Sequence, residues 1–164
     1  MDSIHIRRAQ PRDAEAIANF NQAIARETEN KELISDVILA GVNALLSNPA
    51  YGFYIVAETD AKVVACLMIT TEWSDWRNGL FWWVQSVFVS PEYRRRGIYR
   101  SMYSFIRELA NNEPNVCGFR LYVEQNNTRA QATYTALGMS QSPYYIFEEL
   151  KADIDYLDER PTRS

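Results

Sequence analysis

The sequence has few of the residues that would tie a protein to a metal ion or to an oxidising compartment. Its 164 residues include two cysteines and one histidine. Cys66 and Cys117 form no CxxC pair, so a zinc or thiol-redox motif is not indicated. Each cysteine lies in an apolar, strand-like run, and we expect both to be buried, reduced thiols of a cytoplasmic protein. His5 has no second histidine beside it, and we expect no metal.

Long apolar runs and a strong charge of one sign are also missing. No apolar stretch approaches the roughly 20 residues that a membrane helix requires. The first five residues contain no basic segment followed by an apolar one, so no signal peptide is expected. The net charge of −4 does not favour binding to nucleic acid or to a membrane by bulk charge. We therefore expect a cytoplasmic protein with no nucleic-acid and no membrane partner.

The residues that are present suffice for one packed domain. A chain of this length can bury about two-thirds of its unfolded surface without disulfide or metal support. Four Trp, ten Tyr and seven Phe suit a large core, a binding cleft or both. We expect a single domain over residues 1–152 and a polar tail over residues 153–164.

Hydrophobic periodicity predicts a mixed α/β domain, with an α+β mixed sheet. A charged break is expected at 27–31, a polar and aromatic loop at 72–79, and a helix cap at Gly138. The predicted strands lie at 4–7, 51–58, 63–71, 80–89, 116–124 and 144–150. The predicted helices lie at 11–26, 33–46, 97–111 and 128–137.

The most informative stretch is the one in which the strand at 80–89 runs into a basic loop and then a helix. The loop contains three arginines, Arg94, Arg95 and Arg96, followed by Gly97. A helix N-terminus presents free backbone N–H groups with a partial positive charge. A glycine allows a phosphate to approach closely, and arginines add forked donors. The pattern alone predicts a pyrophosphate site or, equally, a solvated basic loop that caps a helix.

A second pattern opens the predicted helix at 128–137. Ala130 and Tyr134 are four residues apart and so share one helix face. A small residue there leaves room for a ligand beside the tyrosine hydroxyl. The alternatives are that Tyr134 packs in the core and that Asn127 is a plain helix N-cap.

Together the two stretches resemble the signatures of the GNAT family of N-acetyltransferases. Arg94-x-x-Gly97-x-Tyr99 is similar to the family's motif A, with Tyr99 in place of a small residue. The second signature matches at Asn127, Ala130, Tyr134 and Gly138, with Met139 in place of the usual Phe. The two signatures stand in the family's order, and the resemblance covers most of the chain.

The resemblance implies a GNAT-like acyl-CoA N-acyltransferase fold, a central, mostly antiparallel twisted sheet flanked by helices. It implies an enzyme that transfers the acetyl group of acetyl-CoA to a primary amine of a small molecule by direct attack through a tetrahedral intermediate. The residues that it assigns to acetyl-CoA are Val87, Phe88, Val89, Arg94, Arg95, Arg96, Gly97, Ile98, Tyr99, Arg100, Ser101 and Asn127.

The resemblance also assigns chemical roles. Tyr134 matches the family's general acid, which protonates the departing thiolate. The N–H groups of Val87 or Val89 are expected to stabilise the carbonyl oxygen. Many members carry a carboxylate base where this chain has Gln85 and Ser86, and neither of these can act as an ordinary base. Water-mediated proton removal is the alternative, with one of four carboxylates at its far end, which are otherwise solvated surface charges: Glu27, Glu29, Glu72 and Glu124.

In this fold the acceptor usually enters between the first two helices and the strand loops. Acidic residues beside tryptophan suit a cationic amine through charge and cation–π contact. The alternative is a hairpin whose tryptophans pack on the sheet. The residues expected to meet the acceptor are Glu27, Glu29, Glu72, Trp73, Asp75 and Gln85.

Other functions remain open on these residues. The acceptor could be a peptide or protein amine. The chain could instead be a non-catalytic acyl-CoA sensor, which Gln85 favours and the retained Tyr134 opposes. A nucleic-acid contact through Arg94–Arg96 has little support in an acidic chain. A homodimer is possible through the aromatic strand predicted at 144–150.

Overall fold

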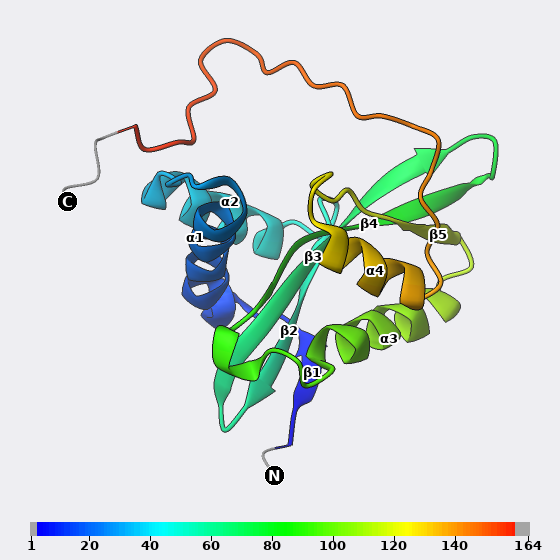
Figure 1. Ribbon diagram of the computed structural model, residues 1–164, viewed down its shortest axis with the longest axis horizontal. Coiled ribbons are helices and arrows are strands. Elements are labelled where there is room, and N and C mark those ends of the chain that lie inside the picture. Colours follow the sequence, from blue (N-terminus) through cyan, green and yellow to red (C-terminus); the bar gives the residue numbers. More distant parts are fainter. Residues whose placement is uncertain (1–2, 160–164) are drawn as a thin grey trace. The chain divides into compact units, whose positions relative to one another are not determined.

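The computed structural model describes residues 3–159, which divide into two compact units (Figure 1). The first, called the sheet unit, comprises residues 3–121 with 156–159, and the second, called the α4 unit, is Tyr122–Asp155. The strands are β1 (His5–Arg8), β2 (Phe53–Thr59), β3 (Lys62–Ser74), β4 (Gly79–Val89) and β5 (Val116–Arg120). The helices are η1 (Pro11–Asp13), α1 (Ala14–Glu29), α2 (Ser35–Ser47), η2 (Pro91–Tyr93), α3 (Ile98–Asn111) and α4 (Thr128–Ala136).

The five strands form one mixed sheet in the order β1-β2-β3-β4-β5. Neighbouring strands are antiparallel from β1 to β4, and β5 is parallel to β4. A parallel neighbour requires a crossover, and α3 supplies it between these two strands. The predicted fold class, a mostly antiparallel mixed sheet flanked by helices, is therefore confirmed.

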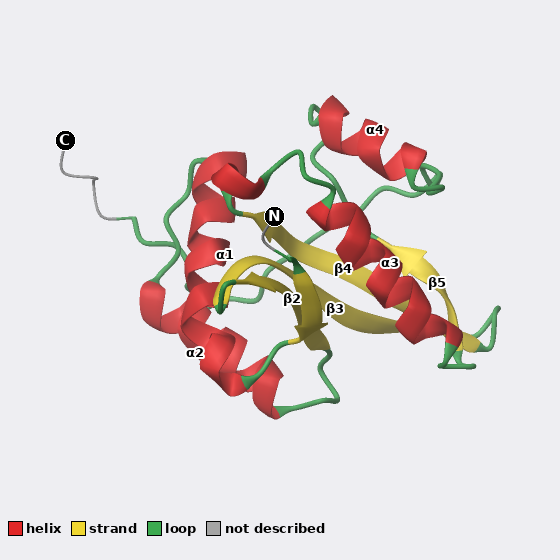
Figure 2. Ribbon diagram, turned by 90° about the horizontal axis from the view of Figure 1, so that it is seen from below, coloured by secondary structure: helices red, strands yellow, loops and turns green. Residues whose placement is uncertain are grey.

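Helices cover both faces of the sheet because its central strands are apolar on both sides. Tyr54 and Val56 of β2 pack in one core with residues of α1 and α2. Ile55 lies between them in sequence and is fully buried, so its side chain points to the opposite face, where α3 contacts β1 and β2. Figures 1 and 2 show α1 and α2 together on one side of the sheet unit and α3 on another.

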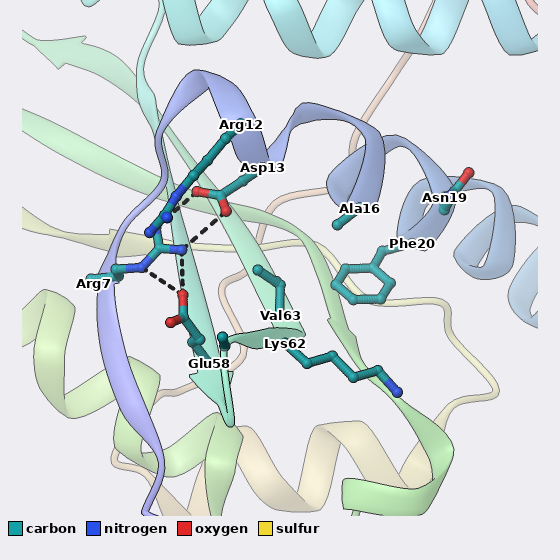
Figure 3. Close-up of a pocket in the computed structure, with 10 residues that line it drawn as sticks. Arg7, Arg12, Asp13, Ala16, Asn19, Phe20, Glu58, Lys62 and Val63 are labelled. Atoms are coloured by element: carbon teal, nitrogen blue, oxygen red, sulfur yellow. Dashed lines mark hydrogen bonds and ion pairs between the residues drawn. The ribbon is translucent and has the colours of Figure 1, made fainter.

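A buried ion cluster fastens β1, η1 and β2 together (Figure 3). The Arg7 guanidinium donates to both carboxylate oxygens of Asp13, at 2.8 and 3.0 Å, and to Glu58. The backbone N–H of Gln10 also donates to Asp13, at 2.7 Å. Burial by itself raises the pKa of Asp13, but these hydrogen bonds outweigh it and the pKa lies below its ordinary value.

Several predicted boundaries are wrong. The charged break expected at 27–31 begins inside α1, which continues to Glu29 and ends at Asn30 in the left-handed conformation. β3 continues to Ser74 and β4 begins at Gly79, so only residues 75–78 of the loop expected at 72–79 form a turn. β5 ends at Arg120 rather than at residue 124, because its pairing with β4 stops there.

The strand predicted at 144–150 is absent: the described chain has no strand or helix between α4 and the isolated bridge at Leu157. The residues are strand-forming, but a strand also needs a hydrogen-bonding neighbour. The polar tail expected from residue 153 is ordered in part, because Leu157 pairs with Leu33. Residues 160–164 lie outside the described residues, and the split into a domain over 1–152 and a tail stays a prediction.

The two cysteines differ. Cys66 is buried as predicted, and burial raises its thiol pKa to about 12. Cys117 lies on the edge strand β5 and is exposed, so the prediction of a second buried thiol is wrong. No helix in the described part of the chain is both long and apolar enough to cross a membrane. Within residues 3–159 no three acidic, histidine or cysteine side chains gather as a metal site would require.

Candidate functional site

A β-bulge interrupts β4 near its C-terminal end. Cys66 of β3 pairs with Phe88 and Met68 pairs with Gln85, so Ser86 and Val87 together face one residue of β3. Ser86 adopts a left-handed backbone with φ of 51°, a conformation that costs energy for a residue other than glycine. The Cys66 thiol donates to the Ser86 carbonyl at 3.5 Å. Strain of this kind concentrates at functional sites in proteins.

Beyond the bulge, one edge of β4 has no strand neighbour in the described chain. Pairing with β5 ends at Trp83, whereas β3 follows β4 to Val89. The Ser90 N–H donates toward β3, to the Val64 carbonyl at 2.8 Å. Because peptide groups alternate along a regular strand, the N–H group of Val89 points toward the other edge. A backbone donor is thus aimed at the place where β4 and β5 separate.

The loop after β4 leads directly into α3, and the backbone at the start of this helix is exposed. Gly97 is the N-cap and is left-handed, with φ of 74°, and a Cβ placed on it would meet nothing within 4 Å. Ser101 N–H donates back to the Gly97 carbonyl at 3.0 Å, so the helical ladder begins there. The N–H groups of Ile98, Tyr99 and Arg100 precede that first bond and form the positive end of the helix.

The three arginines of this loop have different surroundings. Arg94 donates through Nε to the Val89 carbonyl at 2.8 Å and through Nη2 to both oxygens of Glu27, at 2.9 and 3.1 Å. Its guanidinium also lies 5.4 Å from the Phe88 ring centroid. Arg96 lies over the ring of Tyr93 at 5.1 Å. Arg95 is left-handed, with φ of 63°, and exposed. Arg94 therefore ties the loop to α1.

Tyr99 departs from the small residue of the family pattern. Its ring lies 6.2 Å from that of Tyr103, one turn further along α3. The ring thus packs along the helix, and the backbone N–H of Tyr99 remains part of the helix start.

The α4 unit carries the second signature. The Asn127 side chain accepts a hydrogen bond from the Ala130 N–H at 3.1 Å and is the N-cap of α4. Gly138 is left-handed, with φ of 95°, and Met139 N–H reaches back to the Tyr134 carbonyl at 3.0 Å, which confirms the predicted glycine cap. Burial raises the pKa of Tyr134 above its ordinary value.

Two of the predicted acceptor residues lie well away from the bulge. Glu72 is opposite Phe81, six residues before Val87 on β4, which corresponds to about 20 Å along the strand. Its carboxylate accepts hydrogen bonds from Arg120 and from the Trp83 indole. Asp75 lies further out, in the turn between β3 and β4. The structure therefore does not bring Glu72 and Asp75 to the bulge.

The other predicted acceptor residues are distributed as follows. Gln85 lies directly before the bulge, and Glu27 is held near Val89 by Arg94. Glu29 is exposed at the end of α1. Trp73 is exposed rather than packed on the sheet. Glu124, which was predicted only as a possible end of the water-mediated proton relay, accepts a hydrogen bond from the Asn126 N–H at 2.9 Å.

A separate pocket of about 460 Å³ lies between the start of α1 and the β2–β3 hairpin. Figure 3 shows that the Arg7 ion cluster and Phe20 line it. None of the residues predicted for the functional site borders this pocket. Its charged groups are mostly paired with one another, which is typical of a structural cluster.

Comparison with known proteins decides the family. The family model described as the acetyltransferase (GNAT) family matches residues 14–139. The chain belongs to the GNAT acetyltransferase family. A possible acetyltransferase from Clostridium difficile 630 is 47% identical, with a TM-score of 0.84 over 90% of this chain and 97% of that chain. No curated protein matches the chain.

More distant solved structures share the GNAT fold. The aminoglycoside N-acetyltransferase AAC(6')-Iy, in complex with CoA, is 16% identical with a TM-score of 0.74, over 92% of this chain and 97% of that one. A predicted acetyltransferase with acetyl-CoA from Clostridium acetobutylicum is 16% identical with a TM-score of 0.74, over 90% and 96%. At this identity the likeness shows the fold alone.

The residues of this GNAT chain fit an acyl-CoA. The open space beside Gly97 lets a pyrophosphate approach the backbone donors at the start of α3. Two features of this region escaped the sequence analysis. The Ser86 bulge carries no glycine to signal it, and the Arg94–Glu27 pair joins residues 67 positions apart, which no local pattern reveals.

Proposed function

We propose that this GNAT protein transfers the acetyl group of acetyl-CoA to a primary amine of a small molecule. The observation that carries the proposal is the bulge at Ser86–Val87, near which one edge of β4 is open. The loop that follows leads to the N-terminus of α3, whose first backbone N–H groups have no partner within the helix. Backbone donors for a carbonyl oxygen and for phosphates thus follow one another within about a dozen residues. Bound acetyl-CoA would supply the activated acetyl group.

The chain's own residues would bind and orient the reactants. The N–H group of Val89, which points to the open edge, or that of Val87 at the bulge would stabilise negative charge on the acetyl oxygen. The start of α3, together with Arg95 and Arg96, would hold the phosphates. Arg94 is paired with Glu27 and would act by fixing the loop. Asn127 caps α4, and the GNAT resemblance assigns it to the cofactor.

Tyr134 is the proposed general acid. A tyrosine phenol is protonated at neutral pH, as a donor to a departing thiolate requires, and burial raises its pKa further. Gln85 offers no carboxylate base, and Glu27, Glu72 and Glu124 each have hydrogen-bond partners in the structure. We therefore propose that the amine loses its proton to water before it attacks, which favours acceptors with a low amine pKa.

Two observations support a small-molecule amine as the acceptor. Two of the proteins that share the fold, AAC(6')-Iy and HMB0005, are named aminoglycoside acetyltransferases, and both are below 25% identity. The exposed acidic residues of α1 suit a cationic amine. A peptide or protein amine is the second candidate, and the acceptor panel below separates the two.

The test is CoA release from acetyl-CoA across aminoglycosides, polyamines, amino acids, arylamines and short peptides. We expect turnover on a small-molecule class. Tyr134→Phe should lower kcat by about 100-fold or more, the usual contribution of a general acid. Tyr51→Phe is the matched control, because Tyr51 is an exposed hydroxyl in the turn before β2, and its kcat should not change.

Turnover on peptides alone would show that the acceptor is a peptide or protein amine and not a small molecule. An unchanged kcat in Tyr134→Phe would show that Tyr134 is not the general acid. Acetyl-CoA binding by calorimetry with no turnover on any class would contradict the enzyme and favour a sensor.

A further inference from the structure

Cys66 is a buried thiol that the proposed reaction does not use. It lies on β3, the middle strand of the sheet, and is fully buried. Val56 of β2 and Phe88 of β4 are its partners in register on either side, and all three pack in the core with α1 and α2. A substrate cannot reach a side chain in this position. Any part that the thiol plays in the reaction must therefore act through the residue that it contacts.

The thiol contacts the backbone of the bulge. Its Sγ donates a hydrogen bond to the Ser86 carbonyl, at 3.5 Å. Ser86 and Val87 together face Leu67, because the residues on either side of Leu67 pair with Phe88 and Gln85. A bulge takes the peptide between its two residues out of the regular ladder. The thiol therefore supplies a hydrogen-bond donor to a carbonyl at the point where the ladder is interrupted.

The same contact fixes the direction of a backbone donor. The peptide between Ser86 and Val87 is trans, so its C=O and N–H groups point in opposite directions. Because the carbonyl is turned toward Cys66, a residue of β3, the Val87 N–H is turned away from it. The edge of β4 that β3 does not occupy has no strand neighbour beyond Trp83 in the described chain. The contact therefore keeps the Val87 N–H away from β3, as a donor to a ligand must be.

The peptide needs such a contact because Ser86 is strained. Its φ of 51° is in the left-handed region, which costs energy for any residue with a side chain. A strained residue keeps its conformation only where the surrounding structure holds it. Cys66 is suited to this role, since close packing in the core leaves its side chain little freedom to move. The thiol thus links a rigid part of the core to a strained peptide.

We propose that Cys66 is a positioning residue, whose thiol holds the Ser86 carbonyl and thereby directs the Val87 N–H at the acetyl oxygen of acetyl-CoA. The inference rests on the proposed function, and it names the interaction that prepares Val87 as a donor. Cys66 itself touches neither reactant. The alternative is that Cys66 only fills the core, as a small apolar side chain would.

Two substitutions separate these roles. Cys66→Ser keeps a side-chain donor at this position, whereas Cys66→Ala has none. Serine and alanine are smaller than cysteine by about the same volume, so an effect of lost packing should be similar in the two variants. Cys117→Ser is the control, because Cys117 is an exposed thiol on β5.

The first experiment follows the Ser86 carbonyl carbon and the Val87 amide proton by NMR. A carbonyl carbon that loses a hydrogen bond moves upfield, so we expect an upfield shift in Cys66→Ala and little change in Cys66→Ser. Acetyl-CoA should move the Val87 amide proton downfield relative to CoA, which lacks the acetyl group, in wild type and Cys66→Ser but not in Cys66→Ala. The spectra also show whether each variant is folded. Equal responses of Cys66→Ala and Cys66→Ser would overturn the proposal.

The second experiment measures kcat on the acceptor that the panel identifies. Removal of an oxyanion donor costs about 100-fold or more, and a misdirected donor loses part of this, so Cys66→Ala should lower kcat by about fivefold or more. Cys66→Ser should recover most of the wild-type kcat, and Cys117→Ser should retain all of it. The CoA dissociation constant should be the same in every variant, because the phosphates are proposed to bind at the start of α3. A kcat that falls equally in Cys66→Ser and Cys66→Ala would show that only packing matters and would overturn the proposal.

The two proposals fail in different ways. A wild type that binds no acetyl-CoA, or that binds it and transfers the acetyl group to no acceptor, would contradict the proposed function. A wild type whose Val87 amide does not distinguish bound acetyl-CoA from bound CoA would overturn the role of Cys66, whatever the turnover. The Ser86 carbonyl shift needs no ligand, so it tests the hydrogen bond itself in either case.

Discussion

Among single residues, Arg7 joins separate elements of the fold through ion pairs. It is mostly buried and holds the carboxylates of Asp13 and Glu58, each from a different element. Asp13 in turn is almost fully buried. A buried carboxylate that loses its cation is costly, because neither water nor another charge replaces the lost interaction.

Arg7→Met should therefore lower the free energy of unfolding by about 3–5 kcal/mol at pH 7. Arg12→Met, which removes an exposed arginine of η1, should change it by no more than about 0.5 kcal/mol. Urea unfolding followed by circular dichroism measures both. Equal effects of the two substitutions would show that the cluster adds nothing to stability.

The same cluster predicts a pH dependence. The pKa of Asp13 is lower in the folded chain than in the unfolded chain, so its contribution is present above the unfolded value, about 4, and is lost as the pH falls through the folded value. In Arg7→Met the buried carboxyl favours its protonated form instead. The stability difference between wild type and variant should therefore narrow below about pH 4.

At the scale of elements, the β4–α3 loop depends on α1. Arg94 connects the Val89 carbonyl to Glu27, and its guanidinium lies near Phe88, whose ring stacks on Phe20 of α1 at 4.9 Å. The loop that we propose to hold the phosphates is thus fixed by a helix that the GNAT signatures do not include. Glu27, predicted as an acceptor contact, is better placed to hold this loop.

Glu27→Gln should weaken the binding of CoA itself. An exposed ion pair contributes about 0–1 kcal/mol, so the dissociation constant for CoA should rise by up to about fivefold. Glu29→Gln, at the exposed end of the same helix, should leave it unchanged. Calorimetric titration with CoA measures both variants without any acceptor. If Glu27→Gln binds CoA normally but has a raised KM for the amine, Glu27 contacts the acceptor, as the sequence suggested.

At the scale of the whole molecule, a ligand that binds only the folded chain must raise its stability. CoA at 100 times its dissociation constant should add about 2.7 kcal/mol, or about 5–10 °C in Tm for a chain of this size. Adenosine, which lacks the phosphates that the start of α3 would hold, should produce little shift at the same concentration. Differential scanning calorimetry measures the comparison, and equal shifts would argue against phosphate binding there.

The local features of this chain could be predicted from its sequence. The strand at 80–89, the helices that begin near residues 97 and 128, and the cap at Gly138 all follow from periodicity and from glycine and asparagine chemistry within a few residues. The two GNAT signatures lie on these elements, so the family and the fold followed from them. Such features depend on interactions between near neighbours, which a sequence displays directly.

The tertiary structure alone decided the features that depend on distant partners. The bulge at Ser86 exists because two strands pair in a shifted register, and the roles of Glu27 and Glu72 follow from Arg94 and Arg120, which lie far along the chain. The segment at 144–150 is strand-forming by composition yet forms no strand in the described chain, because a strand requires a neighbour that composition cannot supply.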